Sequence, residues 1–273
     1  MDNRSLHHIS PVLGLHCSGA NGLEWRRLAN LSAGPGAVVL PEFLGNPSRG
    51  HWTKARKFSL ADEASGFLTA LLELGRPCHI VGHSFGGAVG LHILRHHPEL
   101  VASLCLYEPT CFHVLRDLDE EGVELLQGII EFNDRLKTVL LKGKSDLAAR
   151  MFTDFWSGEG SYDALTMERK EALGYFAPKA VPDFEALLWE AETAGDLNSD
   201  IPVTLIYGEH TQLQTRRIID VLSGRFNCPS VHSVTGAAHM GPFTHRDIVN
   251  ELVVTHIIRA EIAIGEAKPQ FSG

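Results

Sequence analysis

A single serine lies among glycines in residues 80–89, IVGHSFGGAV, where Ser84 stands between Gly82 and Gly86. Glycine loses more backbone freedom on folding than any other residue, so a run this rich in glycine needs a structural reason. The pattern G-x-S-x-G predicts a sharp turn from a buried strand into a helix, which presents the serine hydroxyl above a sheet. A Cβ in place of either flanking glycine would collide with the neighbouring strand and helix. We therefore expect Ser84 to be a nucleophile.

A serine hydroxyl is a poor nucleophile until a base takes its proton, and histidine is the commonest base. His239 lies in the segment VTGAAHMGPFTH, after the last predicted strand and before the closing helix. This is the place of the base when the nucleophile, the acid and the base follow in that order. His245 lies nearby but is expected to begin the closing helix, so we select His239. A surface-loop histidine is the alternative, because the chain has 15 histidines.

A carboxylate should orient the imidazole and stabilise its charged form. The usual pattern would place an aspartate at position 211, but that position is Thr211, which cannot carry the charge. Glu209 lies two residues earlier and should point elsewhere from the end of its strand. Glu108 ends the strand after the serine's helix, 24 residues beyond Ser84, and can reach the same histidine from the neighbouring strand. We select Glu108 and keep Glu209 as the alternative.

Acyl transfer also needs N–H donors for the oxyanion that develops on the substrate. One donor is expected from Phe85, the residue after the nucleophile, and the other from the backbone N–H of Ser18 in the loop LHCSGANG. An ordinary glycine-containing turn is the alternative for this loop. We expect Phe152, Trp156 and Met240 to line the substrate pocket, although burial within a helix explains the first two equally well.

Short apolar runs and helical patterns alternate along the chain, as required to position these residues. The runs are apolar throughout rather than at every second residue, which is typical of parallel strands covered on both faces. The predicted strands are residues 12–17, 37–43, 78–84, 101–108, 203–209 and 230–234. The predicted helices around them are residues 23–31, 61–74, 87–97 and 244–262. The alternation predicts an α/β fold with a doubly wound, mostly parallel sheet.

One region interrupts this alternation, because residues 112–200 contain no convincing strand. They contain amphipathic helical patterns at 120–141, 145–156 and 181–192. We expect an all-helical insertion whose apolar faces pack over the ends of the strands as a cap. The predicted division is therefore a core of residues 1–111 and 201–273, with residues 112–200 as the inserted cap.

The composition excludes several classes of protein. The 273 residues are 44% hydrophobic, enough for a large core. Lys plus Arg is 24 and Asp plus Glu is 33, and the resulting net charge of −9 argues against nucleic-acid binding. No apolar stretch is long enough to cross a membrane, and the first ten residues lack a secretion signal, so we expect a cytoplasmic location. Five scattered cysteines predict buried thiols, without disulfides or a metal site.

The chain resembles the α/β-hydrolase superfamily over nearly its whole length. The resemblance lies in the H-x-x-G loop, the G-H-S-x-G-G turn, the helical insertion and the late G-x-x-H-M segment. Cys17 replaces the glycine of the usual L-H-G-x loop, and Thr211 replaces the usual acid. In pancreatic-type lipases and some haloalkane dehalogenases the acid follows the strand after the nucleophile, which is similar to the position of Glu108. The resemblance also implies that the leading antiparallel hairpin of the full fold is reduced or absent here.

The predicted function is a carboxylesterase-like serine hydrolase that cleaves a small or medium ester through an acyl-enzyme, without metal or organic cofactor. Epoxide hydrolases and dehalogenases of this superfamily have Asp where this chain has Ser84. A carbon–carbon bond, thioester or lactone hydrolase with the same three residues is the alternative among enzymes. A ligand receptor that retains them is the alternative from another class.

Overall fold

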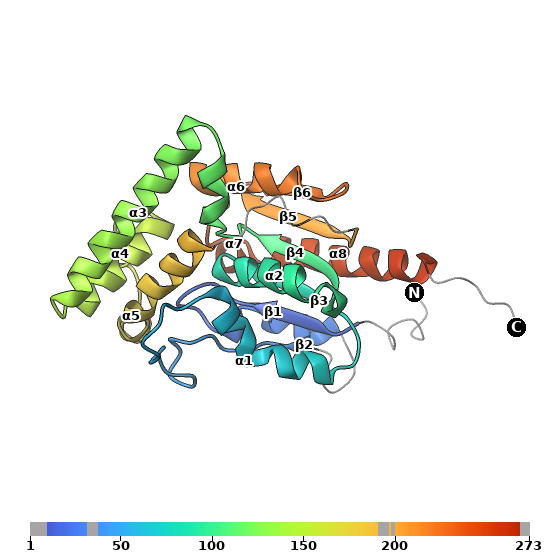
Figure 1. Cartoon of the computed structure of the whole chain (residues 1–273), viewed down its shortest axis with the longest axis horizontal. Coiled ribbons are helices and arrows are strands. Elements are labelled where there is room, and N and C mark those ends of the chain that lie inside the picture. The colour runs from blue at the N-terminus through green and yellow to red at the C-terminus, as the bar shows by residue number, and fades with distance from the viewer. Residues whose placement is uncertain (1–9, 32–37, 191–196, 198–199, 268–273) are drawn as a thin grey trace, which may run out of the picture.

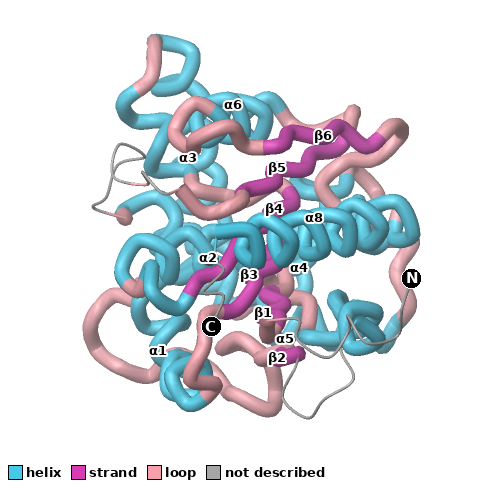
Figure 2. Tube along the Cα trace, turned by 90° about the vertical axis from the view of Figure 1, so that its right-hand side faces the viewer, coloured by secondary structure: helices cyan, strands magenta, loops and turns pink. Residues whose placement is uncertain are grey.

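The fold is built on a six-stranded sheet. The computed structural model describes residues 10–31, 38–190, 197 and 200–267. The strands lie in the order β2-β1-β3-β4-β5-β6, and every neighbouring pair is parallel. Figure 2 shows this order. The strands are β1 (Val12–Leu15), β2 (Val38–Val39), β3 (Cys78–His83), β4 (Val101–Tyr107), β5 (Val203–Gly208) and β6 (Ser230–Val234). The predicted doubly wound parallel sheet is confirmed.

Helical segments cover both faces of the sheet. In Figure 1, α1 and α2 lie in front of the strands and α8 lies behind them. One face packs against α1 (Leu60–Glu73), α2 (Phe85–His96) and α6 (Leu213–Ser223). The other face packs against η2 (Gly22–Leu31) and α8 (Arg246–Ala267). The apolar runs of the sequence are continuous because water reaches neither face of the central strands.

The central strand β4 shows how alternate side chains supply the two layers. Leu104 and Leu106 pack into the layer that contains α1 and α2. Cys105 and Tyr107 pack into the opposite layer, with η2 and α8. All four side chains are buried, as expected when successive residues of a strand point to opposite faces.

Two predicted elements differ in the structure. Residues 23–31, predicted as a regular helix, form the 3₁₀ segment η2, which is kinked at Trp25. The indole of Trp25 is buried beside Gly14 and donates to the Leu15 carbonyl at 3.0 Å, so packing on β1 determines the local backbone. The strand predicted over 37–43 is only Val38–Val39 among the described residues, because residues 40–43 do not pair with β1.

Helices fill the region between β4 and β5, and among its described residues there is no strand. These helices are η4 (Phe112–Asp117), α3 (Glu120–Leu141), α4 (Ser145–Ser157) and α5 (Met167–Trp189). Figure 1 shows α3, α4 and α5 gathered beyond one end of the sheet. The division into core 1–111 and 201–273 and cap 112–200 stays a prediction.

Helix α5 begins 14 residues before the predicted start at position 181, since its first residue is Met167. It continues through Pro178 and Pro182, each of which lacks the N–H that a helix interior uses. Phe176, Ala177 and Phe184 are buried on this helix, so tertiary packing offsets the lost hydrogen bonds.

Two further expectations concern the N-terminus and membranes. A leading hairpin would lie in residues 1–9, which are outside the described residues. In the part of the chain that the structure describes, no helix combines the length and apolarity needed to span a bilayer.

The close approach of α2 to the loop after β1 gives a first prediction. A Cβ built on Gly86 would lie 2.4 Å from the backbone oxygen of Leu15. Gly86→Ala should therefore lower the free energy of unfolding by about 3 kcal/mol, measured by urea denaturation.

Gly128→Ala is the matched control, because a Cβ at this exposed position of α3 meets nothing within 4 Å. It should raise the free energy of unfolding by about 0.5–1 kcal/mol through helix propensity. A Gly86 variant as stable as the Gly128 variant would contradict the close approach.

Candidate active site

Ser84 occupies the turn between β3 and α2. Its backbone has φ 55° and ψ −119°, a strained conformation for a residue with a side chain. Hydrogen bonds to the next strand hold this turn: the Ser84 N–H donates to the Tyr107 carbonyl at 3.0 Å, and the Thr110 N–H donates to the Ser84 carbonyl at 3.3 Å. These contacts therefore stabilise a backbone conformation of Ser84 that is unfavourable in the absence of the surrounding structure.

His239 lies between Ser84 and Glu108. Its Nε2 is 3.0 Å from Ser84 Oγ, and its Nδ1 is 2.8 Å from Glu108 Oε2. An ionised carboxylate only accepts hydrogen bonds, so the neutral ring carries its proton on Nδ1 and donates it to Glu108. The lone pair of Nε2 then accepts the hydroxyl proton of Ser84. The alternative His245 lies between α7 (Gly241–Thr244) and α8, where its Nδ1 is 2.9 Å from the Thr244 hydroxyl.

Glu108 follows β4 and is fully buried, with a φ of 43°. While Oε2 faces His239, Oε1 accepts the Gly208 N–H from the end of β5 at 2.8 Å. The alternative acid Glu209 points elsewhere, because its carboxylate accepts the Gly236 N–H at 2.8 Å. The geometry thus brings Glu108, rather than Glu209, to His239.

Burial and hydrogen bonding act in opposite directions on the pKa of Glu108, and likewise on the pKa of His239. Burial alone would raise the pKa of Glu108, but the hydrogen bond and positive charge of His239, with the Gly208 N–H, hold it below its ordinary value. Burial lowers the pKa of His239, and the opposing effect of Glu108 only partly restores it. Near neutral pH, the site therefore contains an ionised Glu108 and a neutral imidazole that can accept a proton.

Two further contacts restrain His239, one at its ring and one at its backbone carbonyl. The indole of Trp156, from α4, stacks on it with ring centres 3.9 Å apart and planes 21° from parallel. On the opposite side of the chain, His83 Nε2 lies 2.8 Å from the backbone carbonyl of His239. A helix of the insertion and the end of β3 thus both restrict the movement of the histidine.

His83 forms a buried pair with Glu24. Its Nδ1 is 2.6 Å from Glu24 Oε1, while its Nε2 faces the carbonyl of His239. A carbonyl only accepts, so Nε2 carries a proton. Through Nε2 of His83, this pair also restrains the backbone carbonyl of His239.

The same pair belongs to the group with a metal-site composition among the described residues, formed by Cys17, Glu24 and His83. Their candidate ligand atoms lie within 4.8 Å of one another. Both ring nitrogens of His83 already face oxygen partners, and Glu24 also accepts the Cys17 N–H at 3.0 Å. Burial, with the nearby charge of Glu24, raises the pKa of the Cys17 thiol well above its ordinary value, which disfavours the thiolate that metals bind. These donors fit a hydrogen-bond network better than a metal.

A pocket opens above Ser84 and His239, with a cavity volume of about 90 Å³. The three predicted pocket residues Phe152, Trp156 and Met240 all line it. The remaining lining residues are Cys17, Ser18, Thr153, Ser157, Leu165, Arg169 and Leu173. The insertion and the core therefore both contribute walls around the serine hydroxyl.

The two residues selected as oxyanion donors flank the serine in different ways. Phe85 is the first residue of α2, so its N–H has no acceptor within the helix. Ser18 lines the pocket beside Ser84. Their roles as donors stay predictions.

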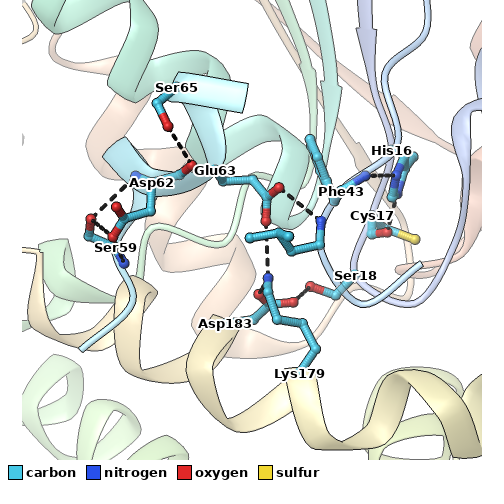
Figure 3. A network of polar contacts seen from close by, with 11 residues as sticks. His16, Cys17, Ser18, Phe43, Ser59, Asp62, Glu63, Ser65, Lys179 and Asp183 are labelled. Atoms are coloured by element: carbon cyan, nitrogen blue, oxygen red, sulfur yellow. Dashed lines mark hydrogen bonds and ion pairs between the residues drawn. The ribbon is translucent and has the colours of Figure 1, made fainter. Parts of the chain in front are cut away.

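A network seen in Figure 3 ties the Ser18 loop to α5. The Ser18 hydroxyl donates to Asp183 at 2.7 Å, and Asp183 also pairs with Lys179 one turn earlier on α5. Lys179 donates to Glu63 of α1 at 3.0 Å. Burial raises the pKa of Asp183 to about 6, against the opposing charge of Lys179. One buried lysine thus joins the core, the insertion and the loop beside Ser84.

Three charged residues that were not predicted from the sequence lie at the pocket or at the loop beside it: Arg169, Lys179 and Asp183. All three belong to α5. The first half of this helix was not predicted, because the segment contains prolines. The charged pair in the otherwise apolar segment FAPKAVPDF, with the i,i+4 spacing of a helix, was an available signal.

The parallel sheet, the turn at Ser84 and the late histidine are features of one known fold class. A model of the alpha/beta hydrolase family matches residues 12–252, nearly the whole chain. The chain belongs to this family, and the resemblance found in the sequence is confirmed.

Individual relatives match parts of the chain. RutD of Pantoea ananatis, to which carbamate hydrolase activity is ascribed, is 35% identical over 117 residues, which cover 39% of this chain and 42% of RutD. Lipase LipV of Mycobacterium tuberculosis is 36% identical over 100 residues, which cover 36% of each protein. The match thus spans less than half of either relative.

A solved structure shows the same fold over a longer range. It comes from work on carboxylesterases of Nitrososphaera gargenis, and it superposes with a TM-score of 0.69 at 18% identity. The superposition covers 94% of this chain and 92% of that one. At this identity the likeness shows the fold alone.

The contact between Glu108 and His239 gives a second prediction. Glu108→Gln should lower the pKa of His239 further, because both the hydrogen bond and the charge of the carboxylate favour the protonated ring. The measurement is a pH titration of the His239 ring resonances by NMR. Glu209→Gln removes the same charge at a carboxylate bound to Gly236 and should leave this pKa nearly unchanged. A larger shift in the Glu209 variant would assign the acid to Glu209.

Proposed function

We propose that this protein is a serine hydrolase that cleaves a small or medium carboxylic ester through an acyl-enzyme intermediate. The observation that supports this most strongly is the continuous hydrogen-bonded path from Ser84 Oγ through His239 to Glu108, with distances of 3.0 and 2.8 Å. The path lies at the base of a pocket whose other walls are mainly apolar. Family membership is consistent with a hydrolase.

The first half of the proposed reaction forms the acyl-enzyme. His239 Nε2 takes the proton of Ser84 while Oγ attacks the acyl carbon, and the electron pair of the carbonyl moves onto its oxygen. The N–H groups of Ser18 and Phe85 stabilise this oxyanion. The tetrahedral intermediate collapses, and the alcohol leaves with the proton that His239 returns. Glu108 stabilises the imidazolium between these steps.

The second half uses water as the nucleophile. His239 takes a proton from the water while its oxygen attacks the acyl carbon, and a second oxyanion forms in the same place. When this intermediate collapses, the carboxylic acid is released and Ser84 regains its proton from His239. No step in this scheme requires a metal or an organic cofactor.

Residues 112–200 act as the cap in this proposal. The stacking of Trp156 on His239 and the wall formed by Phe152 support it, because both come from α4 of the insertion. Covering the site excludes water from the developing charges and so strengthens the electrostatic interactions within it. The cytoplasmic location inferred from the sequence also stays a proposal.

The proposal predicts that Ser84→Ala abolishes turnover of a p-nitrophenyl short-chain ester. The loss should be at least about 10⁴-fold in kcat, because Ser84 Oγ is the hydroxyl that lies against the proposed base, His239 Nε2. The variant should also lose labelling by a fluorophosphonate, while its far-UV circular dichroism matches the parent. Ester turnover that survives this change would contradict the serine mechanism.

The same experiment separates the alternatives. A carbon–carbon bond, thioester or lactone hydrolase would label with the fluorophosphonate but turn over its own substrate class faster than any ester in a substrate panel. A ligand receptor that retains the three residues would turn over every member of the panel very slowly.

The pKa of His239 sets the expected pH dependence. The proposed base must be neutral, so kcat/KM should rise with pH as His239 loses its proton. Burial holds this pKa below the ordinary value of about 6.5, so the acid limb of the profile should have its midpoint below that pH. The measurement is kcat/KM for the neutral ester as a function of pH. A midpoint clearly above the ordinary histidine value would contradict the buried, neutral ring.

A further inference from the structure

Arg169 places a cation in the wall of the pocket that contains Ser84 and His239. It lies in the first turn of α5 and is half-buried. It also lines two adjoining hollows, one between the Ser18 loop and α5 and one at the mouth beside Phe243. A group in the pocket or entering through its mouth therefore passes this side chain.

No carboxylate among the described residues lies within ion-pair distance of Arg169. Two other cations of the insertion do have carboxylate partners: Arg150 pairs with Asp163, and Lys179 pairs with Glu63 and Asp183. Even Lys170, the next residue on α5, donates to the Asp163 carbonyl at 3.0 Å. The guanidinium of Arg169 is thus available to a ligand.

The other residues that line the pocket carry no competing fixed charge. They are aliphatic, aromatic, thioether or hydroxyl side chains, together with the neutral His239 and the thiol of Cys17. The positive charge of Arg169 reaches this loop, since it partly offsets the effect of burial on the pKa of Cys17. Its field therefore acts within the space next to the nucleophile.

We propose that Arg169 binds a carboxylate of the substrate, so that the preferred ester carries a free carboxylate in its acyl or its alcohol part. This inference rests on the proposed function and specifies its substrate class. A guanidinium matches a carboxylate through two parallel N–H···O bonds. A carboxylate also neutralises the single cation, whereas a phosphate monoester with a charge of about −1.5 to −2 would leave excess negative charge in the pocket.

The kinetic test uses esters that differ by one charge. 4-Nitrophenyl hydrogen glutarate carries the carboxylate on the acyl side, and 4-carboxyphenyl butyrate carries it on the alcohol side. Each is compared with its methyl-capped, neutral counterpart. We expect kcat/KM to favour at least one of the anionic esters, and we expect Arg169→Gln to reduce that preference about 10- to 100-fold. No preference for either anion, or a preference that Arg169→Gln retains, would overturn the proposal.

Lys170→Gln is the matched control, because it removes the same charge one residue later on α5, from a side chain that does not line the pocket. It should leave the ratio of anionic to neutral kcat/KM within about two-fold, as expected for a screened surface charge. An equal loss in this variant would mean that overall charge, and not Arg169, selects the anion.

A binding measurement separates this proposal from the proposed function. Calorimetry of monomethyl glutarate, which carries a single negative charge, with the Ser84→Ala variant needs no turnover. Adding Arg169→Gln should weaken the binding of this monoanion about ten-fold or more, and adding Lys170→Gln should not. The carboxylate site would be overturned if monomethyl glutarate did not bind, if Arg169→Gln left its binding unchanged, or if inorganic phosphate bound more tightly. Failure of ester turnover and fluorophosphonate labelling, with binding of monomethyl glutarate intact, would overturn the serine mechanism alone.

Discussion

The strained turn at Ser84 is the constraint on which the rest of the site depends. A positive φ at a residue with a side chain is unfavourable, and it persists here because close packing and hydrogen bonds around the turn stabilise it. Gly86 lies against the loop after β1, and the Tyr107 carbonyl binds the turn from β4. The same contacts bring the carboxyl ends of β1, β3 and β4 together. Ser84, the Ser18 loop and Glu108 therefore converge as a consequence of holding one turn.

The histidine depends on contacts that are distant in sequence. Glu108 is bonded to its ring, His83 to its backbone, and Trp156 covers its face. Each contact restricts the movement of His239, whose ring must keep one tautomer and one orientation to act as the proposed base. Because the ring is buried, the carboxylate at 2.8 Å acts through a medium of low polarity, where charges interact more strongly than in water. Positive φ at both Ser84 and Glu108 is consistent with strain concentrated at a functional site.

Much of this arrangement was predictable from local patterns. Continuous apolar runs indicated the parallel strands, and the order of the strands and helices indicated where Ser84, Glu108 and His239 would meet. Two of the errors share one physical cause. Helix α5 continues through Pro178 and Pro182 because its buried face packs on the core, and η2 is kinked because Trp25 packs on β1. In both segments tertiary burial outweighs local propensity, which is all that a pattern of residues records.

The sequence by itself determined the class of fold and singled out Ser84, His239 and Glu108, because glycine spacing and strand-end positions are local properties. The tertiary structure decided what surrounds them. It selected Glu108 over Glu209 by the direction of two side chains, and it placed Arg169 in the pocket wall without a carboxylate partner. Such decisions depend on distances between segments far apart in the chain, and a linear sequence contains those distances only after the chain has packed.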